Sequence, residues 1–123
     1  MGSLTGKAAL VTGASRGIGR AIAERLGREG ASVIVNYAAR ADQAKEVVAE
    51  VESTGGKALA LQADMGKVVE IRRLFERAVD WAGRLDIAVT NAGVFRPKPL
   101  TEVTEEEFEE TMAINAIGTF FAL

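Results

Sequence analysis

The chain has 123 residues, a formal net charge of −2 and 48% hydrophobic residues, and it contains neither cysteine nor histidine. This length indicates one domain that can build a core. The missing cysteine excludes disulfides and thiolate chemistry, and the missing histidine removes the commonest general base and metal ligand, so no metal site is predicted. No basic face or run indicates nucleic-acid binding, and no apolar segment is long enough to cross a membrane or to act as a signal region. We therefore expect a cytoplasmic protein with neither nucleic-acid nor membrane partners.

The first predicted elements are a strand and a helix joined by a glycine-rich turn. Residues 8–11 form an apolar run without charge, which is typical of a strand buried on both faces. A helix is predicted to begin near Gly17, because apolar residues then recur at helical spacing at Ile18, Ala21, Ile22 and Leu26. Strand, glycine turn and helix in this order form the context in which a glycine motif indicates phosphate binding.

Each of the three glycines in this turn has a predicted physical role. Gly13 lets the chain turn sharply out of the strand, Gly17 lets the backbone approach a pyrophosphate, and Gly19 lets the helix pack closely on the strand. The free N–H groups at the start of the helix would then face the anion, together with the positive end of the helix dipole. The alternative is an ordinary tight turn between a strand and a helix.

Strands and helices alternate along the remaining chain, which predicts parallel βαβ units with right-handed crossovers. The second strand is expected at 31–35, with residues 36–40 as a loop. The later expected elements are a helix at 42–53, a strand at 57–62, a helix at 69–81, a strand at 87–89, and a fourth helix that follows a capping box at 104–107 and continues to the last residue.

Four features together resemble the short-chain dehydrogenase/reductase family, most closely ketone reductases of the 3-oxoacyl-carrier-protein type. They are residues 12–19 with the spacing Thr-Gly-x-x-x-Gly-x-Gly, Asp64, Asn91-Ala92-Gly93 and Asn115. The resemblance implies an α/β fold with a Rossmann-like parallel sheet of strand order 3-2-1-4 and helices on both faces. Residues 1–123 would then be the N-terminal part of a single dinucleotide-binding domain that stops before the fifth strand.

The resemblance also implies roles for individual residues. The phosphates and the adenosine ribose of the cofactor would be surrounded by Gly13, Ser15, Arg16, Gly17, Ile18 and Gly19. Asp64 would accept a hydrogen bond from the adenine amino group, with Met65 beside it, and Asn91, Ala92 and Gly93 would line the ribose. An alternative for Asp64 is a helix N-cap, since it precedes the third helix.

Asn115 matches an asparagine that, in the family, helps to hold the catalytic lysine through water. It therefore has a supporting catalytic role by resemblance only. A purely structural cap or bridge is the alternative, because an amide on an apolar helix face needs hydrogen-bond partners.

Charge at the end of the second strand predicts the choice of cofactor. An NAD site usually presents Asp or Glu there to the ribose 2′-hydroxyl, whereas this chain has Asn36 and Tyr37. A 2′-phosphate would not be repelled, and Arg16 or, less favourably, Arg40 could pair with it. We therefore expect NADP(H) to be preferred over NAD(H).

The residues that carry the family's hydride transfer between nicotinamide and a carbonyl or alcohol carbon are missing. In the family, a serine and a Tyr-x-x-x-Lys motif follow the point that corresponds to Leu123. The one tyrosine here, Tyr37, has no lysine four positions later. The chain alone is therefore predicted to be inactive, with a small carbonyl substrate only in a complete enzyme. The alternative is a non-catalytic nucleotide-binding or self-associating half-Rossmann module.

The strand at 87–89 is predicted to lie at an edge of the sheet although its composition is apolar. An apolar edge strand favours pairing with another chain, and the last helix would expose a face intended for the missing half. We therefore expect a homo-oligomer.

Overall fold

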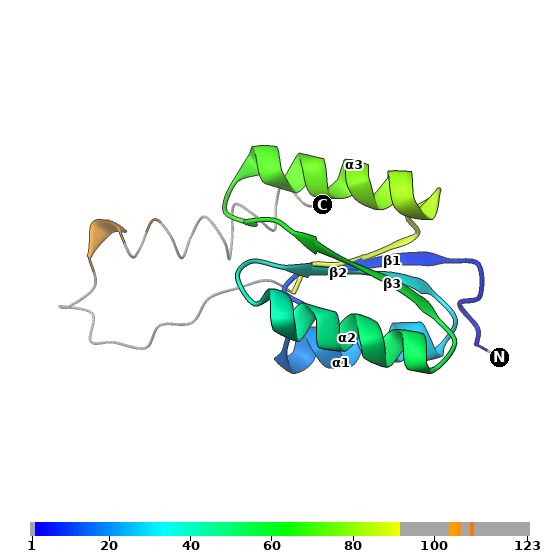
Figure 1. The fold of residues 1–123 in the computed structure, drawn as a ribbon. Helices are drawn as coiled ribbons and strands as arrows, with labels where there is room; N and C mark the ends of the chain where they lie inside the picture. Colours follow the sequence, from blue (N-terminus) through cyan, green and yellow to red (C-terminus); the bar gives the residue numbers. More distant parts are fainter. Residues whose placement is uncertain (1, 92–103, 107–108, 110–123) are drawn as a thin grey trace.

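The computed structural model describes residues 2–91, 104–106 and 109, and within these residues the fold is a parallel sheet between two layers of helices (Figure 1). Helices α1 and α2 cover one face and α3 covers the other, which confirms the prediction of helices on both faces. The sheet has four strands in the order β3-β2-β1-β4, as expected. The elements are β1 (Ala8–Val11), α1 (Gly17–Arg28), β2 (Ser32–Tyr37), α2 (Ala41–Ser53), β3 (Lys57–Gln62), α3 (Val68–Ala82) and β4 (Ile87–Val89).

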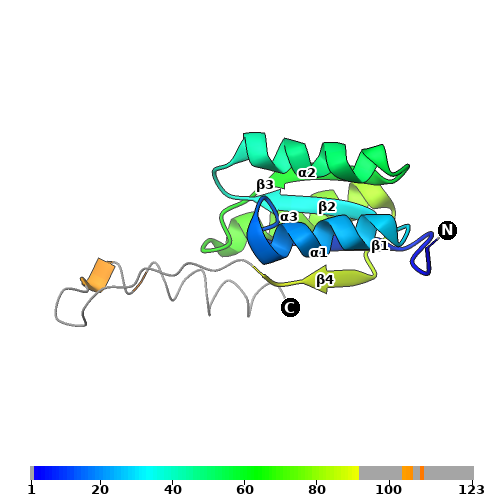
Figure 2. The ribbon, with the colours of Figure 1, turned by 90° about the horizontal axis from the view of Figure 1, so that it is seen from below.

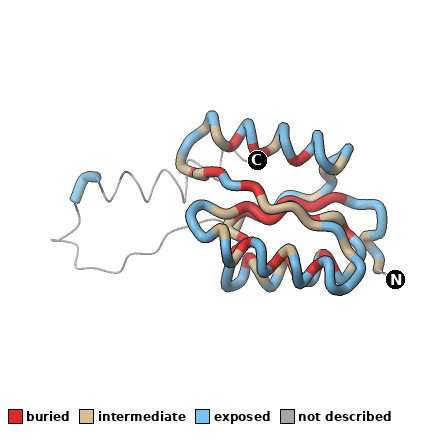
Figure 3. The backbone as a smooth tube through the Cα atoms, in the orientation of Figure 1, coloured by how far each residue is buried: buried red, intermediate tan, exposed pale blue. Residues whose placement is uncertain are grey.

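Successive residues of the central strands face opposite helix layers, because side chains alternate along a strand. Ala9 and Val33 pack in the cluster beneath α1 and α2, whereas Leu10 and Ile34 pack in the cluster beneath α3. All four side chains are fully buried. Figure 3 shows this burial along the central strands. The two clusters explain why residues 8–11 are apolar at every position.

The carboxyl ends of the strands meet at one edge of the sheet, because all the strands run parallel. Val11 of β1 is in register with Val35 of β2 and with Val89 of β4. Seen from the side of α1 and α2, β4 forms one edge of the sheet and α2 lies over the region of β3 at the other (Figure 2). The segments that follow β1, β2 and β4 are therefore neighbours.

The second strand is longer than expected. Asn36 and Tyr37, predicted to begin a loop, belong to β2 and are in register with Leu61 and Gln62 of β3. The prediction was wrong because an asparagine after an apolar run is typical of a turn, whereas here its side chain is only 1% exposed and has hydrogen-bond partners inside the fold.

The buried face of α1 agrees with the predicted one only in part, because Ile22 and Leu26 pack against the core whereas Ala21 is exposed. Ile18, expected on the apolar stripe, is 75% exposed, and the buried residues of the helix are Gly19, Ala23 and Gly27. The reason is the close approach of α1 to its neighbours: a Cβ on Gly27 would lie 2.7 Å from a methyl carbon of Val51 in α2. Small residues thus permit the close approach, beside the partly buried Ile22 and Leu26.

The third helix begins after Lys67, which is its N-cap residue, so the alternative role of Asp64 as that N-cap is wrong. The Asp64 carboxylate instead closes a local turn, because its Oδ1 accepts a hydrogen bond of 2.8 Å from the Gly66 N–H. The helix ends at Gly83 in the left-handed conformation, with φ +78°, as expected.

Of the predicted fourth helix, the structure describes residues 104–106 and 109, where Glu105, Glu106 and Glu109 are helical. Glu107, the far half of the predicted capping box, lies outside the described residues. Among the helices that are described, no segment combines the length and the apolar character that a membrane span requires.

Candidate functional site: the glycine corner after β1

The chain leaves β1, turns through residues 12–16 and enters α1 at Gly17. We call residues 12–19, which comprise this turn and the first turn of α1, the glycine corner. Gly13 has φ +60° and Gly17 has φ +61°, a region that side chains with a Cβ rarely adopt. The predicted succession of strand, turn and helix is therefore confirmed, and the two glycines are needed for the backbone conformation itself.

The peptide groups of Gly13 are held by the strands on both sides of β1. The Gly13 N–H donates to Oδ1 of Asn36 in β2 at 3.1 Å, and the Gly13 carbonyl accepts from Nδ2 of Asn91, just after β4, at 3.1 Å. The next N–H, that of Ala14, donates to the Asn36 carbonyl at 2.8 Å. Asn36 and Asn91 therefore fix the start of the corner from opposite directions.

Gly19 allows the tip of α1 to approach this held peptide. A Cβ on Gly19 would overlap the Gly13 carbonyl oxygen and Nδ2 of Asn91. Gly19 thus allows a close approach as predicted, but its partners are Gly13 in the turn and Asn91 after β4 rather than the expected strand.

Thr12 also contributes to the corner, although the sequence motif gave no role to it. It is 2% exposed, its N–H donates to the Val89 carbonyl at 3.0 Å, and its Oγ1 accepts from the Asn91 N–H at 2.9 Å. Its place directly before Gly13 was the available signal, because a hydroxyl at the end of β1 can reach the neighbouring strand.

The N–H groups of residues 15–19 point to no acceptor within the described part of the chain. The first helical hydrogen bond runs from the Arg20 N–H to the Arg16 carbonyl. The first turn of α1 contains no acidic side chain, and Arg16 makes no side-chain cap. A Cβ on Gly17 would meet nothing within 4 Å. The tip of α1 is therefore open and complementary to an anion.

The two arginines predicted near the cofactor differ in their surroundings. Arg16 is exposed and has no ion pair among the described residues. Arg40 Nε lies 3.8 Å from Oδ1 of Asp42, a weak surface pair. Arg16 is thus the more available cation, in agreement with its position in the corner.

The residues predicted for the adenine side lie beyond the carboxyl end of β3. Asp64 is half-buried; its Oδ1 is used by Gly66, and its N–H donates to Oε1 of Glu70 at 2.9 Å. Met65 is 5% exposed and packs in the core beneath α3.

Tyr37, the last residue of β2, is half-buried against the opposite core cluster. Ala92, Gly93 and Asn115 lie outside the described residues.

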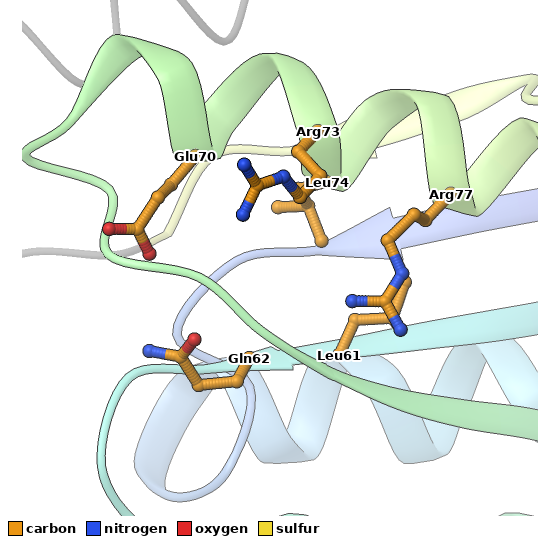
Figure 4. A pocket seen from close by; sticks show the side chains of 6 residues that line it. All are labelled: Leu61, Gln62, Glu70, Arg73, Leu74 and Arg77. Carbon is orange, nitrogen blue, oxygen red and sulfur yellow. The ribbon is translucent and has the colours of Figure 1, made fainter.

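A separate hollow lies between α3 and the edge strand β3 (Figure 4). Its lining consists of Leu61, Gln62, Glu70, Arg73, Leu74 and Arg77. None of these residues belongs to the glycine corner or to the predicted cofactor set, so this hollow is separate from the predicted site.

Comparison with known proteins agrees with the motif. The family model "short chain dehydrogenase" matches residues 7–123. Short chain dehydrogenase/reductase nsrJ of Aspergillus novofumigatus is 53% identical over 120 residues, which are 98% of this chain and 46% of that protein. The chain thus spans about half the length of the curated relatives it matches.

Solved structures give the same result. A short chain dehydrogenase of Burkholderia cenocepacia in complex with NADP superposes with a TM-score of 0.94 at 44% identity, over 97% of this chain and 49% of that one. The angucycline C-6 ketoreductase LanV with bound NADP superposes with a TM-score of 0.91 at 50% identity, over 98% and 49%. The more specific resemblance to 3-oxoacyl-carrier-protein reductases stays a prediction. With its glycine corner and its strand order, this chain belongs to the short-chain dehydrogenase family.

Proposed function

We propose that the glycine corner binds the diphosphate of NADP(H), as the cofactor-binding part of an oxidoreductase that transfers hydride between nicotinamide and a carbonyl or alcohol carbon. The observation that carries the proposal is the open tip of α1, where the N–H groups of residues 15–19 have no acceptor in the described chain. The NADP named for two similar structures supports the choice of ligand.

The proposal places the cofactor across the corner. Gly13, Ser15, Arg16, Gly17, Ile18 and Gly19 surround its phosphates and adenosine ribose, Asp64 and Met65 lie at the adenine, and Asn91, Ala92 and Gly93 line the ribose. Ile18 supports this arrangement, because a 75% exposed apolar side chain at the helix tip is available to a ligand. The free Oδ2 of Asp64, which has no hydrogen bond among the described residues, is available to an amino group.

NADP(H) is proposed over NAD(H) because no carboxylate ends β2. Asn36 and Tyr37 are the last two residues of β2 instead, and Arg16, which has no ion pair among the described residues, offers its charge to a 2′-phosphate. Asn115 keeps its proposed supporting role. Turnover is not expected from this chain alone, since its tyrosine, Tyr37, packs against the core beneath α1 and α2 and has no lysine four positions later. The second candidate is a nucleotide-binding module without catalysis, which the same open tip of α1 would serve.

Two glycine substitutions test the site. Gly17 and Gly55 both have positive φ, +61° and +88°, and a Cβ at either position meets nothing within 4 Å. Alanine at either should therefore cost about 1–2 kcal/mol of stability through backbone strain alone. Only Gly17→Ala places a methyl group where the diphosphate would lie.

We expect similar losses of Tm in Gly17→Ala and Gly55→Ala, measured by thermal unfolding. The dissociation constant for NADPH, measured by fluorescence titration, should rise in Gly17→Ala and stay at the wild-type value in Gly55→Ala. Equal NADPH affinity in both variants, or no binding by the unsubstituted protein, would contradict the proposal.

A further inference from the structure

Asn36 stands at the carboxyl end of β2, where an NAD-binding chain presents a carboxylate to the ribose 2′-hydroxyl. In this fold its side chain is 1% exposed. Oδ1 accepts from the Gly13 N–H at 3.1 Å, and Nδ2 donates to the Leu61 carbonyl at 3.2 Å, with the Ala63 carbonyl at 3.5 Å. The side chain therefore faces the protein interior, and its polar atoms are already used.

This pair of bonds needs a donor and an acceptor on one small planar group. An amide supplies both, whereas an ionised carboxylate of the same shape supplies only acceptors. Aspartate at position 36 would turn an oxygen toward the Leu61 carbonyl and would leave a buried charge without a donor on that side. The residue type is thus set by the fold around the corner.

We infer that Asn36 is a positioning residue of the nucleotide site, which fixes the glycine corner from beneath and does not touch the cofactor. Its side chain holds the Gly13 N–H and its carbonyl holds the Ala14 N–H, directly before the open N–H groups of residues 15–19. Discrimination at the 2′ position then belongs to exposed side chains, namely Arg16 in the corner and the residues that follow β2, beginning with Ala38. This inference rests on the proposed function.

Two carboxylate substitutions separate positioning from cofactor selection. Asn36→Asp removes the donor to β3 and disturbs the corner, whereas Ala38→Asp puts the same charge on the exposed segment after β2. The unsubstituted protein and each variant are titrated with NADPH and with NADH, and backbone amide exchange of Gly13 and Ala14 is followed by NMR.

We expect Asn36→Asp to raise both dissociation constants by about tenfold, with their ratio unchanged, and to accelerate exchange at Gly13. Ala38→Asp should weaken NADPH binding relative to NADH and leave exchange in the corner unchanged. A changed NADPH-to-NADH ratio in Asn36→Asp with unaltered exchange at Gly13 would overturn the inference.

A further variant and the exchange measurement keep the test decisive. If Asn36→Asp does not fold, Asn36→Ser, which is smaller and neutral, replaces it, with the same equal effect on both cofactors expected. If the unsubstituted protein binds neither cofactor, the proposed function fails. Faster exchange at Gly13 in the Asn36 variant than in Ala38→Asp would then still support the positioning role, and equal exchange would overturn it.

Discussion

Gly13 is held at both its N–H and its carbonyl, and this double hold prepares the corner for a ligand. Asn36 and Asn91 come from β2 and from the end of β4, so the position of Gly13 is determined by the whole sheet rather than by the turn alone. A site whose N–H groups are already oriented loses less entropy when an anion binds. The two strands beside β1 thus give the glycine turn a defined shape.

Gly19→Ala should destabilise the protein by about 1–3 kcal/mol, because the added methyl group overlaps the Gly13 carbonyl and the Asn91 amide. Both neighbours are fixed by hydrogen bonds, so the helix tip itself must move. Urea unfolding measures the loss. Ala21→Ser, on the exposed side of the same helix, is the control and should change stability by less than about 0.5 kcal/mol. Equal stability of the two variants would contradict this contact.

Arg16→Ala should weaken binding of NADPH more than binding of NADH, because only NADPH carries a 2′-phosphate for the guanidinium to pair with. A charge-assisted hydrogen bond of about 1.5–3 kcal/mol predicts a roughly tenfold to hundredfold rise in the NADPH dissociation constant. Arg40→Ala is the matched control, since Arg40 already lies near Asp42. Side-by-side titrations decide; a larger effect at Arg40 would assign the phosphate to that residue.

The residues of the corner differ in how far sequence could predict them. Gly13 and Gly17 were predictable because their spacing after an apolar strand indicates a tight turn, and the structure gives both the positive φ that favours glycine. The positions of Thr12 and Asn91 were predictable as neighbours of the strand ends, whereas Asn36 was expected in a loop and belongs to β2. The hydrogen bonds of all three residues were not predictable. Those bonds depend on the register between parallel strands, which one sequence does not reveal.

At the scale of elements, the described strands and helices were predictable from hydrophobic periodicity, since each runs over several residues of one pattern. The packing faces of α1 were less predictable. Gly27 lies where a Cβ would be 2.7 Å from a methyl carbon of Val51 in α2, and hydrophobic periodicity does not identify a glycine as a packing residue. The local sequence pattern predicts where a helix forms, whereas the residues through which the helix packs depend on the element beside it.

An acidic group joins the beginning of β1 to the segment before β4. Asp86 accepts two hydrogen bonds from Arg84, at 2.8 and 2.7 Å, and one of 2.9 Å from the Ala8 N–H. The Arg84 guanidinium, together with the Ala8 N–H, lowers the pKa of Asp86 below its ordinary value. This stabilisation is complete above the unfolded-state pKa and is lost as pH falls through the lower folded-state pKa.

We therefore expect Asp86→Asn to reduce Tm at neutral pH, and the difference from wild type to shrink as pH falls through about 4, where the unfolded Asp is half protonated. Thermal unfolding across this range measures the effect. Asp80→Asn, an exposed carboxylate without an ion pair among the described residues, is the control and should follow the wild-type acid limb. A constant difference between Asp86→Asn and wild type at every pH would contradict the linkage.

At the scale of the whole molecule, β4 leaves one edge of the sheet unpaired within the described chain. β4 pairs with β1 on one side, and in the order β3-β2-β1-β4 no described strand follows it on the other. Ile87 and Val89 are half-buried and Ala88 is exposed. An apolar strand with free N–H and carbonyl groups along one edge favours pairing with another chain.

Light scattering of the 123-residue chain should therefore give a weight-average mass above that of the 13.0 kDa monomer, rising with protein concentration. Ala88→Lys should shift the chain toward monomer, because a charge on an edge strand opposes strand pairing between copies. Ala39→Lys adds the same charge at an exposed position away from this edge and should leave the association unchanged. Both variants alter the net charge equally, so a shift toward monomer in both would mean that overall charge controls the association. If the wild-type chain is a monomer at every concentration, the predicted homo-oligomer is wrong.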